Sequence, residues 1–139
     1  SMVGSLIYLT ITRPDLSYVV GLVSQFMQQP TKPHLDCIRR ILRYVKATQN
    51  YGLFYRADLD IKLEGYTDAD WAGSQTDRRS TSGYMFTLGS AAISWSSKKQ
   101  AIVALSSTEA EYRGAAIATC EEVWIRILLG ELEEDLVLQ

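Results

Sequence analysis

The sequence predicts an α+β protein in which helices come first, followed by an antiparallel sheet and a long helix. Apolar residues recur at helical spacing between residues 16 and 45. They alternate with polar residues between 61 and 68, and return to helical spacing after residue 107. Such changes of period along a chain are typical of helices and strands that occupy separate segments.

Two helices are expected in residues 1–52, arranged as an αα-hairpin. Pro14 stands near the start of the first, where its missing N–H is tolerated. Pro30 and Pro33 separate the two helices, and residues 50–52 end the second. The apolar faces of the two helices comprise Leu16, Val19, Val20, Val23, Phe26 and Met27, and then Leu35, Ile38, Ile41, Leu42 and Val45. We therefore treat residues 1–52 as a helical segment and residues 53–139 as a second domain.

The second domain is predicted to hold three antiparallel strands, with a possible short strand at 53–55. Alternation over residues 61–68 indicates a strand with one polar face. Residues 83–88 and 91–96 form the next two strands, joined by a turn at Gly89-Ser90, after a polar loop at 73–82.

A long helix from about Ser107 to Leu129 follows the strands. A serine or threonine at 106–108 can cap it, and Gly130 is placed to end it. Four aromatic side chains are expected in the core rather than as stacking platforms for nucleic-acid bases: Phe86, Trp95, Tyr112 and Trp124.

Composition limits the class of protein. With 139 residues, of which 47% are hydrophobic, the chain can bury a sizeable core, and no apolar run reaches the length of a membrane span. Cys37 and Cys120 lack the spacing of a metal site, so we expect two buried thiols in a reducing compartment. No secretory signal is visible. The expected location is therefore intracellular, either cytoplasmic or nuclear, without membrane association.

The small net charge of −2 conceals an asymmetric distribution. Residues 31–56 carry six basic residues against Asp36, a balance of +5. Residues 109–135 carry eight acidic residues against Arg113 and Arg126, a balance of −6. Two surfaces of opposite charge on one small protein attract different partners.

Two acidic clusters, residues 66–71 and 107–112, lie at the end of one predicted strand and at the start of the last helix. Mg²⁺ takes oxygen ligands, often one or two carboxylates together with water and substrate phosphate. Asp68 and Asp70 share a strand face, whereas Glu109 and Glu111 lie roughly 200° apart on a helix, so just one of that pair can face the strand. Alternatively, these acids are solvated, cap the helix or shape the turn at Ala72-Gly73. Spacing leaves both interpretations open.

Four motifs in order resemble the ribonuclease H domain of copia-type retrotransposon Pol polyproteins. They are Thr67-Asp68-Ala69-Asp70-Trp71-Ala72-Gly73, Asp77-Arg78-Arg79-Ser80-Thr81-Ser82-Gly83-Tyr84, Ile93-Ser94-Trp95-Ser96-Ser97-Lys98-Lys99-Gln100 and Ala104-Leu105-Ser106-Ser107-Thr108-Glu109-Ala110-Glu111-Tyr112. The stretches Thr12-Arg13-Pro14-Asp15 and Ile41-Leu42-Arg43-Tyr44-Val45-Lys46 resemble the segment that connects reverse transcriptase to that domain.

The resemblance implies a ribonuclease H-like fold and cleavage of the RNA strand of an RNA–DNA hybrid with two Mg²⁺ (or Mn²⁺) ions. Asp68 matches the family's first metal-binding aspartate, and Glu111 matches its glutamate. Asp70 is a further candidate for the metal site. Glu109 is a candidate to position the metal ligands without itself contacting the metal.

The chain departs from the family after its last helix, because the strand that ends in an Asp-Asn pair and supplies a third carboxylate is absent from the sequence. We therefore expect a truncated ribonuclease H-like fold that is catalytically incomplete. The alternative is a non-catalytic, domesticated nucleic-acid-binding or protein-interaction module that acts as a homodimer. An unpaired edge at the strand of Asp68 also favours self-association.

Nucleic-acid contacts are expected from basic residues in three places. Their side chains can reach phosphates, or they can form ordinary solvated surfaces. The candidates are Arg39, Arg43 and Lys46 on the second helix, Arg78 and Arg79 in the loop, and Lys98 and Lys99 before the last helix.

Overall fold

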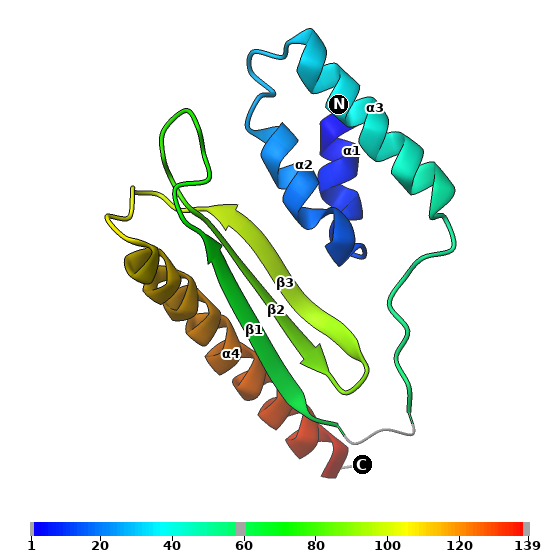
Figure 1. Cartoon of the computed structure of the whole chain (residues 1–139). Helices are drawn as coiled ribbons and strands as arrows, with labels where there is room; N and C mark the ends of the chain where they lie inside the picture. The colour runs from blue at the N-terminus through cyan, green and yellow to red at the C-terminus, as the bar shows by residue number, and fades with distance from the viewer. Residues whose placement is uncertain (1, 58–60, 138–139) are drawn as a thin grey trace.

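The computed structural model describes residues 2–57 and 61–137, and confirms the α+β class. Figure 1 shows a group of helices on one side of a three-stranded antiparallel sheet and a long helix on the other. The elements are α1 (Met2–Leu9), a 3-10 turn (Pro14–Leu16), α2 (Ser17–Ser24), α3 (Lys32–Ala47), β1 (Leu63–Asp70), β2 (Thr81–Leu88), β3 (Ala91–Lys99) and α4 (Ser107–Val137). Among the described residues, no helix combines the length and apolar character that crossing a bilayer requires.

The N-terminal part contains three helices rather than the predicted αα-hairpin. Residues 2–9 form α1, which the sequence analysis missed because this short segment is apolar on most sides. α2 ends at Ser24, earlier than the apolar spacing through Met27 predicted. The three helices share a core of Val3, Leu6, Leu16, Val20, Val23, Ile38 and Ile41.

A buried arginine fastens the corner between α1 and α2 to the end of α3. Arg13 is 6% exposed, and its guanidinium donates to both carboxylate oxygens of Asp15, at 2.9 and 2.7 Å. It also donates to the carbonyl and the hydroxyl oxygen of Thr48, at 3.0 and 2.8 Å. Tyr44 donates its hydroxyl proton to Asp15 at 3.0 Å. The hydrogen bonds from Arg13 lower the pKa of Asp15, and the same contacts raise the pKa of Arg13.

The sheet has the order β1-β2-β3, so β1 is an edge strand in the described part of the chain. Asp68 lies opposite Gly83, and Met85 lies opposite both Tyr66 and Trp95. Gly89 adopts a φ of 62° in the turn between β2 and β3, a conformation that glycine reaches without strain. The three predicted strands are thus present, each with bounds shifted by a few residues.

Residues 53–55 do not form the predicted short strand. The segment is held beside the β2–β3 turn by side chains instead of a backbone ladder. The Tyr55 hydroxyl donates to the carbonyl of Ala92 at 2.7 Å, and the Arg56 N–H donates to Ser90 Oγ at 2.9 Å. An apolar run alone therefore did not distinguish a strand from an anchored extended segment.

Small residues let α4 approach the sheet closely. Ala110, Gly114 and Ala118 recur every four residues and are buried against it. A Cβ atom at Gly114 would lie 3.4 Å from the hydroxyl oxygens of Thr67 and Ser82. Further along, Phe86 of β2 packs with Ala118 and Ile125, over the position where Gly65 has no side chain.

The helix continues through Gly130 to Val137, so the predicted end near Leu129 is wrong. Nothing lies within 4 Å of the position that a Gly130 Cβ would occupy. Glycine ends a helix when the chain turns there into the left-handed conformation. Continuation of the helix means that Gly130 here occupies an ordinary helical position.

Replacing Arg13 by methionine is expected to lower the free energy of unfolding by about 3 kcal/mol, because a partly buried carboxylate loses its cation. Arg39→Met is the matched control. Arg39 pairs with Asp36 at 3.2 Å, but both side chains are more than half exposed, so about 0.5 kcal/mol is expected. Urea unfolding measures both. Equal losses of unfolding free energy in the two variants would contradict the stabilising role assigned to the Arg13 hydrogen bonds.

Low pH is expected to weaken the interaction between Arg13 and Asp15. The pKa of Asp15 is lower in the folded chain than its unfolded value of about 4, so the carboxylate contributes fully above that value. The contribution is lost as the pH falls through the folded-state pKa. The free energy of unfolding should therefore fall more steeply in wild type than in Arg13→Met below about pH 4. Parallel pH profiles of the two proteins would refute this expectation.

Two glycine-to-alanine substitutions are expected to have opposite effects. A methyl group at Gly65 would overlap the Phe86 ring, so Gly65→Ala should destabilise the fold by about 1–3 kcal/mol. Gly130→Ala meets open space inside a helix and should stabilise by up to about 1 kcal/mol. Thermal unfolding distinguishes them. A loss of stability in both would mean that Gly130 is not in an ordinary helical position.

Candidate functional site

Asp68 and Asp70 lie on β1, on the side of the sheet away from α4. Ala69 is buried together with Ala104 and Ala110, so it faces the start of α4. Successive side chains of a strand point to opposite faces, so the two aspartates point the other way. Both are exposed. Asp68 is therefore accessible at the edge strand that Figure 1 shows in green.

Glu111 lies in the first turns of α4 and is exposed. It is eighteen residues from Leu129, a whole number of helical turns, so both lie on the same flank of the helix. Leu129 packs against a cluster that includes Leu63 of β1 and Ile93 of β3. Glu121, on a different side of the helix, accepts a hydrogen bond from Ser94 of β3 at 2.6 Å. Glu111 lies one turn before Gly114, which faces Thr67 of β1 and Ser82 of β2.

The backbones of these two segments meet closely. The position of a Gly114 Cβ, one turn after Glu111, lies 3.6 Å from the carbonyl oxygen of Asp68. The Asp68 side chain nevertheless points to the face of the sheet away from α4, whereas Glu111 is carried by α4 on the other side. A ligand shared by the two carboxylates would have to lie around the edge of β1.

Asp70 packs over the backbone of Gly73, where a Cβ atom would overlap its carboxylate. The turn that follows has Ala72 at a φ of 54°, and its N–H donates to Ser80 Oγ at 3.1 Å. Trp71 donates its indole N–H to the carbonyl of Ala104 at 3.2 Å. These contacts fit the alternative role of Asp70 in shaping the turn, and the residue as a whole is exposed.

Glu109 caps α4. Its carboxylate accepts from the N–H of Leu105 at 2.7 Å, and its own N–H donates to Ser106 Oγ at 3.1 Å. Arg113 also donates to the carboxylate, at 2.8 Å. The Leu105 N–H and then Arg113 lower the pKa of Glu109. Glu109 therefore has local partners for both of its carboxylate oxygens.

Metal binding requires several donors in one place. Among the side chains that the structure describes, those of residues 2–57 and 61–133, no group of three or more His, Cys, Asp or Glu is placed to hold a metal ion. Carboxylates such as Asp68, Asp70 and Glu111 suit Mg²⁺ by donor type. Their number at the β1 edge is too small for a two-ion site.

The candidate nucleic-acid contacts divide into two groups. On α3, Arg39, Arg43 and Lys46 are exposed, and Arg39 is bonded to Asp36. Near β3, Asp77 accepts from Lys99 at 3.1 Å and lies 3.7 Å from Arg79.

Asp77 organises the polar loop at 73–80. A hydrogen bond from the Ser74 side chain, supported by Lys99 and the Arg79 N–H, lowers the pKa of Asp77 to about 2. Arg78 adopts a φ of 57° in this loop. Arg78 and Lys98 are exposed, whereas Arg79 and Lys99 are partly committed to Asp77.

The structure corrects the expected burial of several side chains. Cys37 and Cys120 are both exposed rather than buried. Tyr112 and Trp124 are 74% and 56% exposed, although core positions were expected, whereas Phe86 is buried. Apolar spacing could not locate them correctly because α4 has apolar residues on more than one face.

A buried amide was missed by the sequence analysis. Gln100 follows β3 and is 6% exposed; its Nε2 donates to Ser82 Oγ at 2.8 Å and to the carbonyl of Ala110 at 3.0 Å. It thereby joins β2 to the first turn of α4. Its Oε1 has no hydrogen-bond partner. The polar run at residues 96–100 was the available signal, but it is equally typical of a solvated loop.

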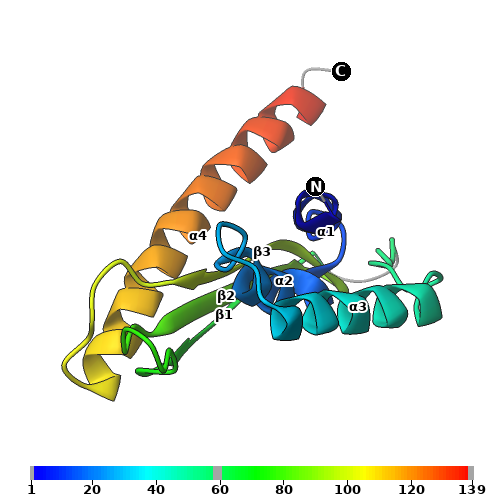
Figure 2. The same ribbon diagram turned by 90° about the horizontal axis from the view of Figure 1, so that it is seen from above.

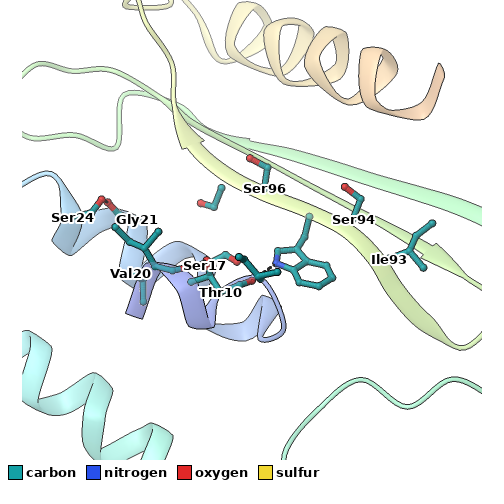
Figure 3. Close-up of a pocket in the computed structure, with 12 residues that line it drawn as sticks. Thr10, Ser17, Val20, Gly21, Ser24, Ile93, Ser94 and Ser96 are labelled. Atoms are coloured by element: carbon teal, nitrogen blue, oxygen red, sulfur yellow. Dashed lines mark hydrogen bonds between the residues drawn. The ribbon is translucent and has the colours of Figure 1, made fainter. Parts of the chain in front are cut away.

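A cavity of about 470 Å³ separates α1 and α2 from β3. Trp95 is among the residues that line it. Figure 3 shows Ser94 and Ser96 pointing away from α1 and α2, toward α4. Trp95 donates its indole N–H to the carbonyl of Thr10 at 2.9 Å. This contact joins the helical segment to the sheet.

Comparison with known proteins gives a consistent relationship. The chain is 53% identical over 131 residues to the retrovirus-related Pol polyprotein from transposon RE1 of Arabidopsis thaliana, and 47% identical over 133 residues to that from transposon TNT 1-94 of Nicotiana tabacum. These alignments cover 94% and 95% of the chain but 9% and 10% of the polyproteins. The chain thus spans about a tenth of their length.

A shorter relative covers nearly the same segment. The secreted RxLR effector protein 161 of Plasmopara viticola is 51% identical over 128 residues, which is 91% of the chain and 90% of that protein. No protein-family model matches the chain, and no solved structure matches it. From these alignments, the chain belongs to the family that contains this short protein and the corresponding segments of retrovirus-related transposon Pol polyproteins.

Proposed function

We propose that the chain is the ribonuclease H-like segment of a copia-type Pol protein, which binds RNA–DNA hybrid and contributes Asp68 and Glu111 as ligands for Mg²⁺ or Mn²⁺. The observation that supports this most is the close approach of α4 to β1 at Gly114, because it brings the turn of Glu111 to the backbone of Asp68. The exposed edge of β1 leaves both carboxylates accessible to a nucleic-acid strand.

The roles proposed for the acidic residues follow from their surroundings. Asp68 and Glu111 have no hydrogen-bond or ion-pair partner in the described part of the chain, so their oxygens are available to a cation. Asp70 lies on the same strand face as Asp68 and can hold a metal-bound water while it shapes the turn at Gly73. A divalent ion, when bound, supplies an activated water and stabilises charge on the leaving oxygen.

The second candidate function is a non-catalytic nucleic-acid-binding module. The lack of a three-ligand group among the described residues favours it, since one or two carboxylates hold a single ion weakly. We propose that this chain by itself binds a hybrid but cleaves it inefficiently.

Contacts with the hybrid are proposed for the exposed cations. Arg43 and Lys46 on α3 have no ion-pair partner in the described part of the chain, and neither has Lys98 at the end of β3. Arg78 likewise has no ion-pair partner in the described part of the chain. Arg79 and Lys99 would first have to give up their contact with Asp77 in order to bind a phosphate. Binding through such contacts weakens as salt is added.

The name of the Plasmopara viticola relative suggests a different activity, secretion as an effector. The pattern Arg-x-Leu-Arg in that name occurs here at residues 40–43. It lies in the middle of α3, and Ile41 within it is buried in the helical core. We therefore interpret these four residues as part of a folded helix, and they carry no proposal of secretion for this chain.

Mn²⁺ titration tests the proposed ligands. Paramagnetic broadening of backbone amide signals is expected at residues 67–70 and 110–112 and should fall strongly in Asp68→Asn. Glu64→Gln is the matched control, because Glu64 lies on the same face of β1 but pairs with Lys62 at 2.7 Å. Broadening that is unchanged by both Asp68→Asn and Glu111→Gln would overturn the assignment.

Incubation with RNA–DNA hybrid and Mn²⁺ then distinguishes the two functions. Cleavage that disappears in Asp68→Asn supports the nuclease. Retention of the hybrid without cleavage, in wild type and in both variants, supports the binding module.

A further inference from the structure

α4 carries a second apolar stripe that the sheet does not cover. Ile117, Trp124 and Ile127 are 50%, 56% and 57% exposed, and Cys120 between them is also exposed. These residues recur three and four apart, so they lie along one flank of the helix. This flank borders the row of Ala110, Gly114 and Ala118, which packs on the sheet. We call this face the α4 stripe.

The last turns of α4 extend past the sheet. A helix of 31 residues is about 46 Å long, whereas an eight-residue strand such as β1 spans about 27 Å. Figure 2 shows the C-terminal turns standing clear of the strands. The second half of the α4 stripe lies just before these turns, and the exposure of Trp124 and Ile127 leaves it open to a partner.

A groove on the opposite side of the molecule has matching properties. It has a volume of about 470 Å³ and lies between α2 and α3. Its apolar lining comprises Leu16, Val19, Leu22, Val23, Cys37 and Ile41. Leu22 is 46% exposed, so its side chain is available for contact. We call this the α2–α3 groove.

The charges at the groove are favourable for an acidic helix. Arg40 lines it, and Arg43 lies one turn further along α3. The two nearby carboxylates are already engaged, Asp15 by Arg13 and Asp36 by Arg39. On the α4 stripe, Glu131 lies four residues after Ile127 and therefore on the same face.

We propose that the α4 stripe of one copy docks in the α2–α3 groove of a second copy, and that the contact is made twice in a reciprocal dimer. Trp124 and Ile127 would bury their apolar surface against Leu22 and its neighbours, with Glu131 near Arg40 or Arg43. Two-fold symmetry closes the assembly, because each copy carries both surfaces. This proposal does not rest on the metal site or on nuclease activity.

The two other ways to form a dimer are electrostatically poorer. Contact between two α4 helices would join segments that are both strongly acidic. Pairing of two β1 edges would bring Glu64, Asp68 and Asp70 of both copies onto one small sheet face. The α2–α3 groove offers cations instead.

A mixing experiment with the full chain tests the proposal. Wild type should sediment with twice the monomer mass, and Trp124→Asp or Leu22→Asp should each halve that mass. In an equimolar mixture, the intact groove of the first variant can receive the intact stripe of the second. The mixture should therefore regain dimers, with weaker association than wild type.

Tyr112→Asp is the matched control, because Tyr112 is 74% exposed on α4 but lies outside the stripe. It should remain dimeric, and circular dichroism should show unchanged helix content in all variants. Monomeric wild type would overturn the proposal. So would a Leu22→Asp variant that stays dimeric, which would indicate α4–α4 or β1–β1 contact, or a mixture that stays monomeric at the highest soluble concentration.

Discussion

The close contact between α4 and the β1–β2 pair is the constraint on which the rest of the structure depends. It requires residues without bulk on both elements, Gly114 and Ala110 on the helix and Gly65 on β1. Because dispersion and apolar burial both fall off when surfaces separate, larger residues at these positions would displace the helix. The same contact brings Glu111 to the β1 edge, so the geometry of the candidate site follows from packing.

In the helical segment, hydrogen bonds of a buried arginine hold separate elements together. Arg13 satisfies Asp15 and Thr48 while buried, and so joins two turns that are 35 residues apart in sequence. Removing one partner would leave a desolvated charge, which costs more than the pair itself contributes. Trp95 then links this segment to β3 through the carbonyl of Thr10. The Arg13 hydrogen bonds, the indole hydrogen bond of Trp95 and the close approach of α2 to β3 at Gly21 together position the three helices against the sheet.

The distribution of charge relates the structure to its proposed partners. Acidic groups gather at β1 and along α4, and cations gather on α3 and near the end of β3. A cation and a phosphate chain would therefore bind different parts of the surface. The same separation makes one face of the molecule complementary to another, which is the physical basis of the proposed dimer.

The amino-acid sequence by itself determined the α+β class, the three strands, the second helix and the start of the last one, because apolar period and capping residues act locally. Sequence reasoning failed where local signals compete with tertiary contacts. Residues 53–55 were predicted to form a strand, but side-chain hydrogen bonds hold them instead. Gly130 was predicted to end the last helix, but it lies within that helix. Tyr112 and Trp124 were predicted to lie in the core but are exposed, because α4 has apolar residues on two faces.

The candidate site divides in the same way. The types and spacing of Asp68 and Glu111 were visible in the sequence, whereas the face from which each side chain starts was not. Tertiary structure decided that these carboxylates approach the β1 edge from opposite sides, since the register of β1 and the rotation of α4 are set by packing against Phe86 and Gly114. It also decided which cations are paired, because Asp77 meets Lys99 only when the loop folds back on β3.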